Sequence, residues 1–240
     1  MLARLALLAA VAAVLAAQEI DDQLPTARLP ERLAFGLHAI GTRPLGDFGR
    51  AVTDAWGLGG EVRFAVDRTG WLAVRIDGGY NAYGRNRRPF TPAVPFDAFG
   101  GVNASQLVSD NTMATLMLGA ELAVPTGAIR PYVNAMAGGS YFQTSTRVEA
   151  PGLPRGDGVT ATNLEDWVGS GAVGGGLRLA LARNRTGTTL LDLGARRWFT
   201  GPTRYATAAA PPSGITGSVP SLRTRTDAWA FTLGFSFAPR

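Results

Sequence analysis

The sequence of 240 residues has no cysteine, no lysine and a single histidine, His38. The lack of cysteine excludes a disulfide scaffold, a thiolate metal site and a cysteine nucleophile, and one histidine is too few for a typical zinc site. Charged residues are 17% of the chain, against about 25% in a typical soluble domain. All 23 basic residues are arginine, and the formal excess of +5 is spread along the chain. We therefore expect no nucleic-acid partner, no metal and no cofactor.

Long apolar runs are also lacking, since none after residue 18 reaches 18 residues, and no transmembrane helix is predicted. The apolar run over residues 5–17 is too short to cross a hydrocarbon core and ends in small residues before a polar segment. This pattern is typical of a secretory signal peptide, cleaved here after Ala16 or Ala17. We predict three segments: a signal peptide over residues 1–17, a polar leader over residues 18–31, and one domain over residues 32–240.

The domain is dominated by alternation of apolar and polar residues. Successive side chains of a strand point to opposite faces, so a period of two predicts β-strands. In the last run, for example, Trp229, Phe231, Leu233 and Phe235 alternate with small or polar residues. The eight predicted strands cover residues 33–40, 56–66, 71–83, 112–124, 130–142, 167–181, 189–198 and 229–237.

The connections between these runs alternate between long and short. The long ones are residues 41–55, 84–111, 143–166 and 199–226, and the short ones are residues 67–70, 125–129 and 182–188. Four long connections at one end and three tight turns at the other are expected of an up-and-down meander. The pattern predicts an all-β fold, an eight-stranded antiparallel up-and-down transmembrane β-barrel with four long external loops.

The two faces of the strands decide between a membrane barrel and a soluble, lipocalin-like calyx. One face carries bulky apolar residues, such as Leu118, Leu177 and Leu179, and we assign it to lipid. The other face carries mostly small residues, which suit a narrow bore. It also carries four acidic and four basic residues, whose balanced charges predict an interior ionic plug. This interior charge network is Glu61, Arg63, Arg75, Asp77, Glu121, Arg178, Asp192 and Arg196.

Aromatic residues gather near the predicted strand ends. Aromatic belts mark the levels where hydrocarbon meets headgroups, so this placement favours a membrane barrel. The predicted girdle is Trp56, Trp71, Tyr80, Tyr141, Trp167, Trp198 and Trp229.

Three segments carry a resemblance to a known family: RPYVNAMAGGSYF from Arg130, LLDLGARRW from Leu190, and FTLGFSF from Phe231. Residues 32–240 resemble the small eight-stranded outer-membrane barrels, which include the OmpA membrane domain, OmpX and OmpW. The resemblance implies a Gram-negative outer-membrane location, a leader on the periplasmic side, and help from periplasmic chaperones and the barrel-assembly machinery. It also implies an assembly signal at the C-terminal end, carried by Phe231, Phe235 and Phe237.

The function expected from these features is structural, or recognition of an unknown extracellular ligand through the four loops. A narrow pore or a conduit for hydrophobic molecules is the first alternative. A lipid A-modifying enzyme is the second, but His38 lies on the inward face with no serine near it in sequence, so we expect a non-enzyme. Loop arginines are candidate contacts for lipopolysaccharide phosphates: Arg85, Arg87, Arg88, Arg204, Arg223 and Arg225.

Overall fold

The structure is a computed structural model that describes residues 31–90, 105–149, 160–207 and 219–239. The predicted signal peptide, residues 1–17, and residues 18–30 of the predicted leader lie outside the described residues. In these described ranges, no helix is long and apolar enough to cross a membrane.

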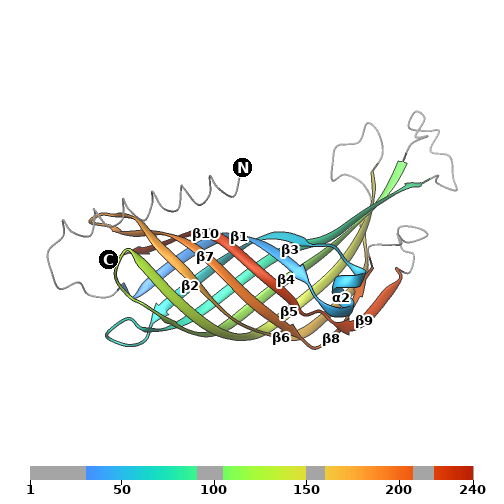
Figure 1. Cartoon of the computed structure of the whole chain (residues 1–240). Coiled ribbons are helices and arrows are strands. Elements are labelled where there is room, and N and C mark those ends of the chain that lie inside the picture. Colours follow the sequence, from blue (N-terminus) through green and yellow to red (C-terminus); the bar gives the residue numbers. More distant parts are fainter. Residues whose placement is uncertain (1–30, 91–104, 150–159, 208–218, 240) are drawn as a thin grey trace, which may run out of the picture.

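Eight antiparallel strands close into a barrel in the order β1, β10, β7, β6, β5, β4, β3, β2 (Figure 1). The predicted eight-stranded up-and-down antiparallel barrel is therefore confirmed. Tight turns join the strands at one end, and two of them use a glycine with positive φ, Gly70 at 77° and Gly127 at 99°. The barrel strands are β1 (Leu33–Pro44), β2 (Ala55–Ala65), β3 (Leu72–Phe90), β4 (Ser105–Ala123), β5 (Ile129–Glu149), β6 (Thr160–Arg183), β7 (Gly187–Thr200) and β10 (Ala228–Pro239).

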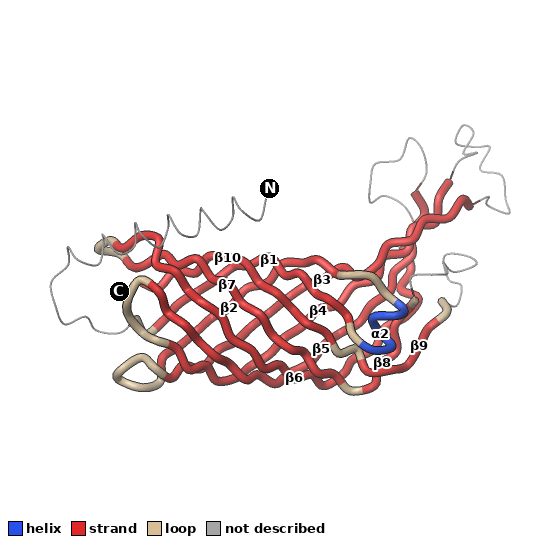
Figure 2. The backbone as a smooth tube through the Cα atoms, in the orientation of Figure 1, coloured by secondary structure: helices blue, strands red, loops and turns tan. Residues whose placement is uncertain are grey.

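At the other end, four strands run far beyond the rest of the barrel (Figure 2). The β3–β4 pairing continues to Phe90 opposite Ser105, and the β5–β6 pairing continues to Arg147 opposite Thr160. The prediction of loops over residues 84–111 and 143–166 is wrong in this respect. Polar cross-strand pairs prolong the ladder where apolar alternation has ended, for example Ser109 with Thr146 at 2.8 Å.

The first and last long connections contain further elements. Helix α2 (Gly46–Ala51) follows β1, and a hairpin of β8 (Pro202–Ala206) and β9 (Ser221–Arg225) joins β7 to β10. Both lie at the end of the barrel opposite the tight turns (Figure 1). The buried ring of Phe48 in α2 makes edge-on contacts with the rings of Tyr83, Phe142 and Tyr205, with centroids 4.8 to 6.2 Å apart. Helix α2 thus packs on the interior at this end.

The outer surface of the barrel is apolar and exposed. The side chains of Leu37 and Trp56 are 76% and 72% exposed. Every barrel strand contributes exposed large apolar side chains, although β7 contributes only Phe199, near its end. Leu179 is a correction to the predicted outer face, because it is 5% exposed. It lies next to the irregularity between Ala180 and Ala182, where the regular β6–β7 register is interrupted, between Ile129 and Leu191 in the register.

Candidate functional site

Arg75 is the centre of the interior charge network. Its guanidinium group is 1% exposed and pairs with three carboxylates. Nε donates to Asp77 Oδ1 at 2.8 Å and Nη1 donates to Glu121 Oε2 at 2.7 Å, while Nη2 contacts Glu61. Each of the three guanidinium nitrogens thus contacts a different carboxylate.

Glu121 links Arg75 to a second buried arginine. Arg178 donates to both oxygens of Glu121, at 2.8 and 2.7 Å, and through Nε to Asp192 at 2.8 Å. Tyr132 completes this corner, because its hydroxyl donates to Asp192 at 2.7 Å and Arg178 lies 3.9 Å from its ring centroid. Sequence reasoning missed Tyr132, although its place two residues before Asn134 puts it on the inward face.

The two remaining arginines join the same network. Arg63 contacts Glu61 at 3.1 Å and Glu121 at 3.7 Å, and Arg196 contacts Asp77. All eight predicted interior charges are therefore linked through direct ion pairs, four positive and four negative. The cluster lies inside the bore of the eight-stranded barrel, where each of these side chains except that of Arg63 is buried.

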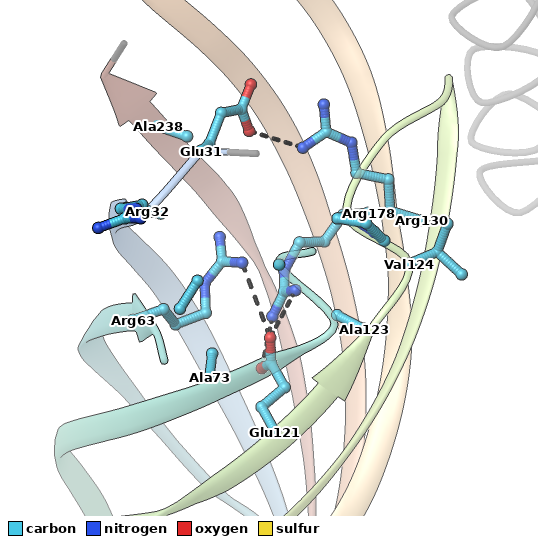
Figure 3. Close-up of a pocket in the computed structure, with 14 residues that line it drawn as sticks. Glu31, Arg32, Arg63, Ala73, Glu121, Ala123, Val124, Arg130, Arg178 and Ala238 are labelled. Atoms are coloured by element: carbon cyan, nitrogen blue, oxygen red, sulfur yellow. Dashed lines mark hydrogen bonds and ion pairs between the residues drawn. The ribbon is translucent and has the colours of Figure 1, made fainter. Parts of the chain in front are cut away.

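Below this network, at the tight-turn end, lies a pocket (Figure 3). Arg63, Glu121 and Arg178 line its inner part, where Figure 3 shows both arginines reaching toward Glu121. Arg130 pairs with Glu31 at 2.7 Å beside it. Alanines at strand ends complete the wall: Ala34, Ala65, Ala73, Ala123 and Ala238.

Above the network, the interior turns apolar. Ile40, Met117 and Met136 pack with further buried side chains up to Phe48 of α2. Trp198 belongs to this cluster and is 5% exposed, which corrects its assignment to the aromatic girdle. The reason is the period of two: Trp198 has the same parity on β7 as Asp192 and Arg196, so it points inward with them.

The other predicted girdle residues point outward. Trp56, Tyr80, Trp167 and Trp229 are exposed toward the long-connection end, and Trp71 is exposed beside a tight turn. Tyr141 is half-buried and its hydroxyl donates to Glu165 at 2.7 Å. The C-terminal aromatic residues Phe231, Phe235 and Phe237 also face outward, on β10.

The loop arginines fall into two groups. Arg85 pairs with Asp110 at 2.5 Å, and Asp110 also pairs with Arg147, so β3, β4 and β5 carry an ion ladder above the barrel. Burial raises the pKa of Asp110. The hydrogen bonds and positive charges of Arg85 and Arg147 lower it by more, so the pKa lies below its usual value. Arg87 is exposed on the same strand as Arg85, and the side chain of Arg88 lies outside the described part of the chain.

The second group is on the hairpin. Arg204, Arg223 and Arg225 are all exposed, and the register sets Arg204 directly opposite Arg223. A phosphate or another anion could approach these side chains from solvent.

The single histidine, His38, lies inside the barrel. It is buried on the inward face of β1, opposite Gly59 and Gly234 in the neighbouring strands. In the part of the chain that the structure describes, no group of three histidine or carboxylate side chains could hold a metal ion.

No family model matches the chain, and no curated protein matches it. Among solved structures, Neisserial surface protein A is 12% identical, with a TM-score of 0.44 over 86% of this chain and 96% of that chain. The attachment invasion locus protein of Yersinia pestis is 10% identical, with a TM-score of 0.43 over 86% and 97%. OprG of Pseudomonas aeruginosa is 12% identical, with a TM-score of 0.40 over 88% and 97%. The chain is similar to these outer-membrane proteins, and its own strand pairing establishes it as an eight-stranded antiparallel up-and-down barrel.

Proposed function

We propose that the protein is a non-enzymatic integral barrel of a bacterial outer membrane, plugged by its own side chains. One observation carries this proposal: the surface is inverted relative to a soluble barrel, with apolar side chains outside and charges inside. Exposed side chains such as Leu58, Leu116 and Leu233 form a band that water would solvate poorly. Acyl chains are the environment that suits such a band.

The height of the band supports the same proposal. On β3, the outward side chains run from Leu72 to Tyr80, with Trp71 just before them. On β10 they run from Trp229 to Phe237. A tilted strand crosses the hydrocarbon core with about 9–11 residues, so aromatic residues mark both boundaries of a band of suitable height.

The interior supports a closed barrel rather than a pore or a conduit. From the tight-turn end, the pocket stops at Glu121 and Arg178. From the other end, Phe48 and the apolar cluster fill the bore. We infer that the role is structural, or recognition of an extracellular ligand through the four long connections, which the rigid barrel presents together.

Assembly and lipid contacts are part of this proposal. Phe231, Phe235 and Phe237 lie on β10, the strand that pairs with β1 to close the barrel. An assembly machinery could read these outward side chains before closure, and periplasmic chaperones could shield them. Lipopolysaccharide phosphates could contact the exposed arginines Arg87, Arg204, Arg223 and Arg225.

Membrane extraction and conductance test the proposal. The protein should stay in the membrane fraction after high salt and carbonate, and its mobility on gels should change on boiling. In planar bilayers it should show no steady conductance. Release by carbonate would overturn the membrane barrel, whereas a stable open channel would overturn the plug and leave the barrel intact.

A further inference from the structure

The outward face of the chain changes character along β9 and β10. Below Trp229, the outward side chains are the apolar band of β10. Above it, Arg223 and Arg225 are exposed on β9, and the half-buried Asp227 lies between β9 and β10. We call Arg223, Arg225, Asp227 and Trp229 the basic strip. Its place directly above the apolar band is the level of lipid headgroups, if the band lies in hydrocarbon.

Two further arginines flank this strip at the level of the tryptophan. The register places Trp229 directly opposite Arg43 of β1 on one side and Arg197 of β7 on the other. The Arg197 guanidinium lies 5.5 Å from the ring centroid of Phe199 and 6.0 Å from that of Trp229. Arg43 is exposed and is the register partner of Trp229 on β1. The tryptophan is therefore set between two cations from neighbouring strands.

Asp227 connects two of these arginines, Arg197 and Arg225, and compensates only part of their charge. Its carboxylate lies 3.5 Å from Arg197 Nη2 and 3.8 Å from Arg225 Nε, and it accepts a hydrogen bond from the backbone N–H of Thr200 at 3.1 Å. One carboxylate is thus shared by two arginines. Arg43 has no ion pair within the described ranges, so the cluster keeps a net positive charge.

The hairpin adds a pair of like charges. Arg204 and Arg223 are directly opposite each other, and the carboxylate of Asp166 accepts a hydrogen bond from the backbone N–H of Arg204 at 2.7 Å. Like charges in this position destabilise a strand pair.

We propose that Arg43, Trp229 and Arg197, with Arg225 above them, form a binding site for the phosphate group of a glycolipid in the outer leaflet. This inference rests on the proposed function, because it requires the apolar band to lie in a membrane. Guanidinium groups bind phosphate with paired, charge-assisted hydrogen bonds. The indole and Phe231, which stack at 6.4 Å, lie next to the site where the acyl chains of the same lipid would begin.

Native mass spectrometry of the full chain in neutral detergent tests the site with three probes. They are lipid A carrying its phosphates, the same lipid with the phosphates removed, and inorganic phosphate. We expect the phosphorylated lipid to bind at least about tenfold more tightly than the dephosphorylated lipid. Equal binding of both lipids, or binding of inorganic phosphate as tight as that of the phosphorylated lipid, would overturn the proposal.

Variants show whether the named residues are responsible. Arg43→Gln combined with Arg197→Gln should lower the affinity for phosphorylated lipid by about tenfold. The matched control is Arg68→Gln combined with Arg185→Gln, which removes the same charge from exposed turns at the opposite end. If both double variants lost the same affinity for phosphorylated lipid, net charge alone would explain the loss and the proposed site would be contradicted. The gel shift on boiling reports folding of each variant, and Arg197→Lys, with its charge intact, should retain more affinity than Arg197→Gln.

Carbonate extraction separates the two proposals. Retention in the membrane together with no preference for phosphorylated lipid would overturn the site alone. Release from the membrane would overturn the proposed function, and the site with it.

Discussion

Arg75 and Glu121 are 2.7 Å apart inside the barrel, although the register sets Arg75 opposite Gly119 rather than Glu121. The pair therefore forms along a diagonal between β3 and β4. Between β2 and β3, directly opposite positions carry like charges, Arg63 against Arg75 and Glu61 against Asp77. The ion pairs therefore run along single strands, along diagonals and across the bore, while Arg178 and Asp192, on β6 and β7, pair directly opposite each other.

Glu121→Gln should destabilise the barrel strongly. The carboxylate accepts hydrogen bonds from Arg75 and Arg178 and lies near Arg63, so its loss leaves buried positive charge without compensation. We expect the free energy of unfolding to fall by about 3–5 kcal/mol, measured by urea titration of the protein folded into vesicles. Glu165→Gln, on the exposed rim, is the control and should change it by less than about 0.5 kcal/mol. Similar small effects at both positions would argue against the plug as a source of stability.

Leu118→Arg tests the outward band. Leu118 is exposed on β4, opposite Ile76 and Ala137. An arginine there would have to enter hydrocarbon, at a cost of about 2–4 kcal/mol in the free energy of unfolding in vesicles. Leu222→Arg, on the hairpin above the band, should cost much less. If the two variants were equally stable, the band would not lie in lipid.

Trp198 and Trp56 should report opposite environments. Trp198 is buried inside the barrel, whereas Trp56 is exposed on its outer surface. Variants that keep only one tryptophan, with the other four replaced by phenylalanine, can be folded into vesicles of lipids brominated along the acyl chain. Fluorescence of Trp56 should be quenched and that of Trp198 should be largely unchanged. Strong quenching of Trp198 would show that its side chain faces the acyl chains and belongs to the aromatic girdle.

Asp67, in a tight turn, should make a pH-dependent contribution to the stability of the folded protein. Hydrogen bonds from the Thr69 hydroxyl and from the backbone N–H of Leu72, Trp71 and Thr69 lower its pKa to about 2. A pKa lowered by folding stabilises the folded state above the unfolded pKa of about 4, and this contribution is lost as pH falls through about 2. Asp67→Asn should therefore reduce stability at pH 6 in urea titrations.

The difference between Asp67→Asn and the unaltered protein should shrink steadily between about pH 4 and pH 2. The hydrogen bond from the Leu72 N–H to Asp67 Oδ1, 2.9 Å long, should weaken over the same range. A difference that did not depend on pH would assign the effect to the shape of the turn rather than to the charge.

Most of the barrel could be predicted from the period of two, because alternate side chains must point to opposite faces of a strand. The number of strands, the tight turns and the inward set from Glu61 to Arg196 all follow from that rule. The same rule would have placed Trp198 inside, had parity been weighed above its position near a strand end. Tyr132 could have been added to the interior on the same ground.

The extensions of β3 to β6 could not be predicted in this way, since polar pairs such as Arg85 with Asp110 carry no apolar alternation. Nor could the position of Phe48, because a six-residue helix gains its place from packing against rings on β3, β5 and β8.

The amino-acid order alone determined which side chains share a face, and therefore that charge lies on one side of the sheet and apolar residues on the other. Only the closed, curved sheet decided which distant charges meet, because Arg196 of β7 and Asp77 of β3 are separated by three strands and pair across the bore. Closure also brought Arg43 next to Trp229, since β10 pairs with the first barrel strand only when the ring is complete. Local periodicity is a property of a strand, whereas these contacts depend on register and curvature around the whole ring.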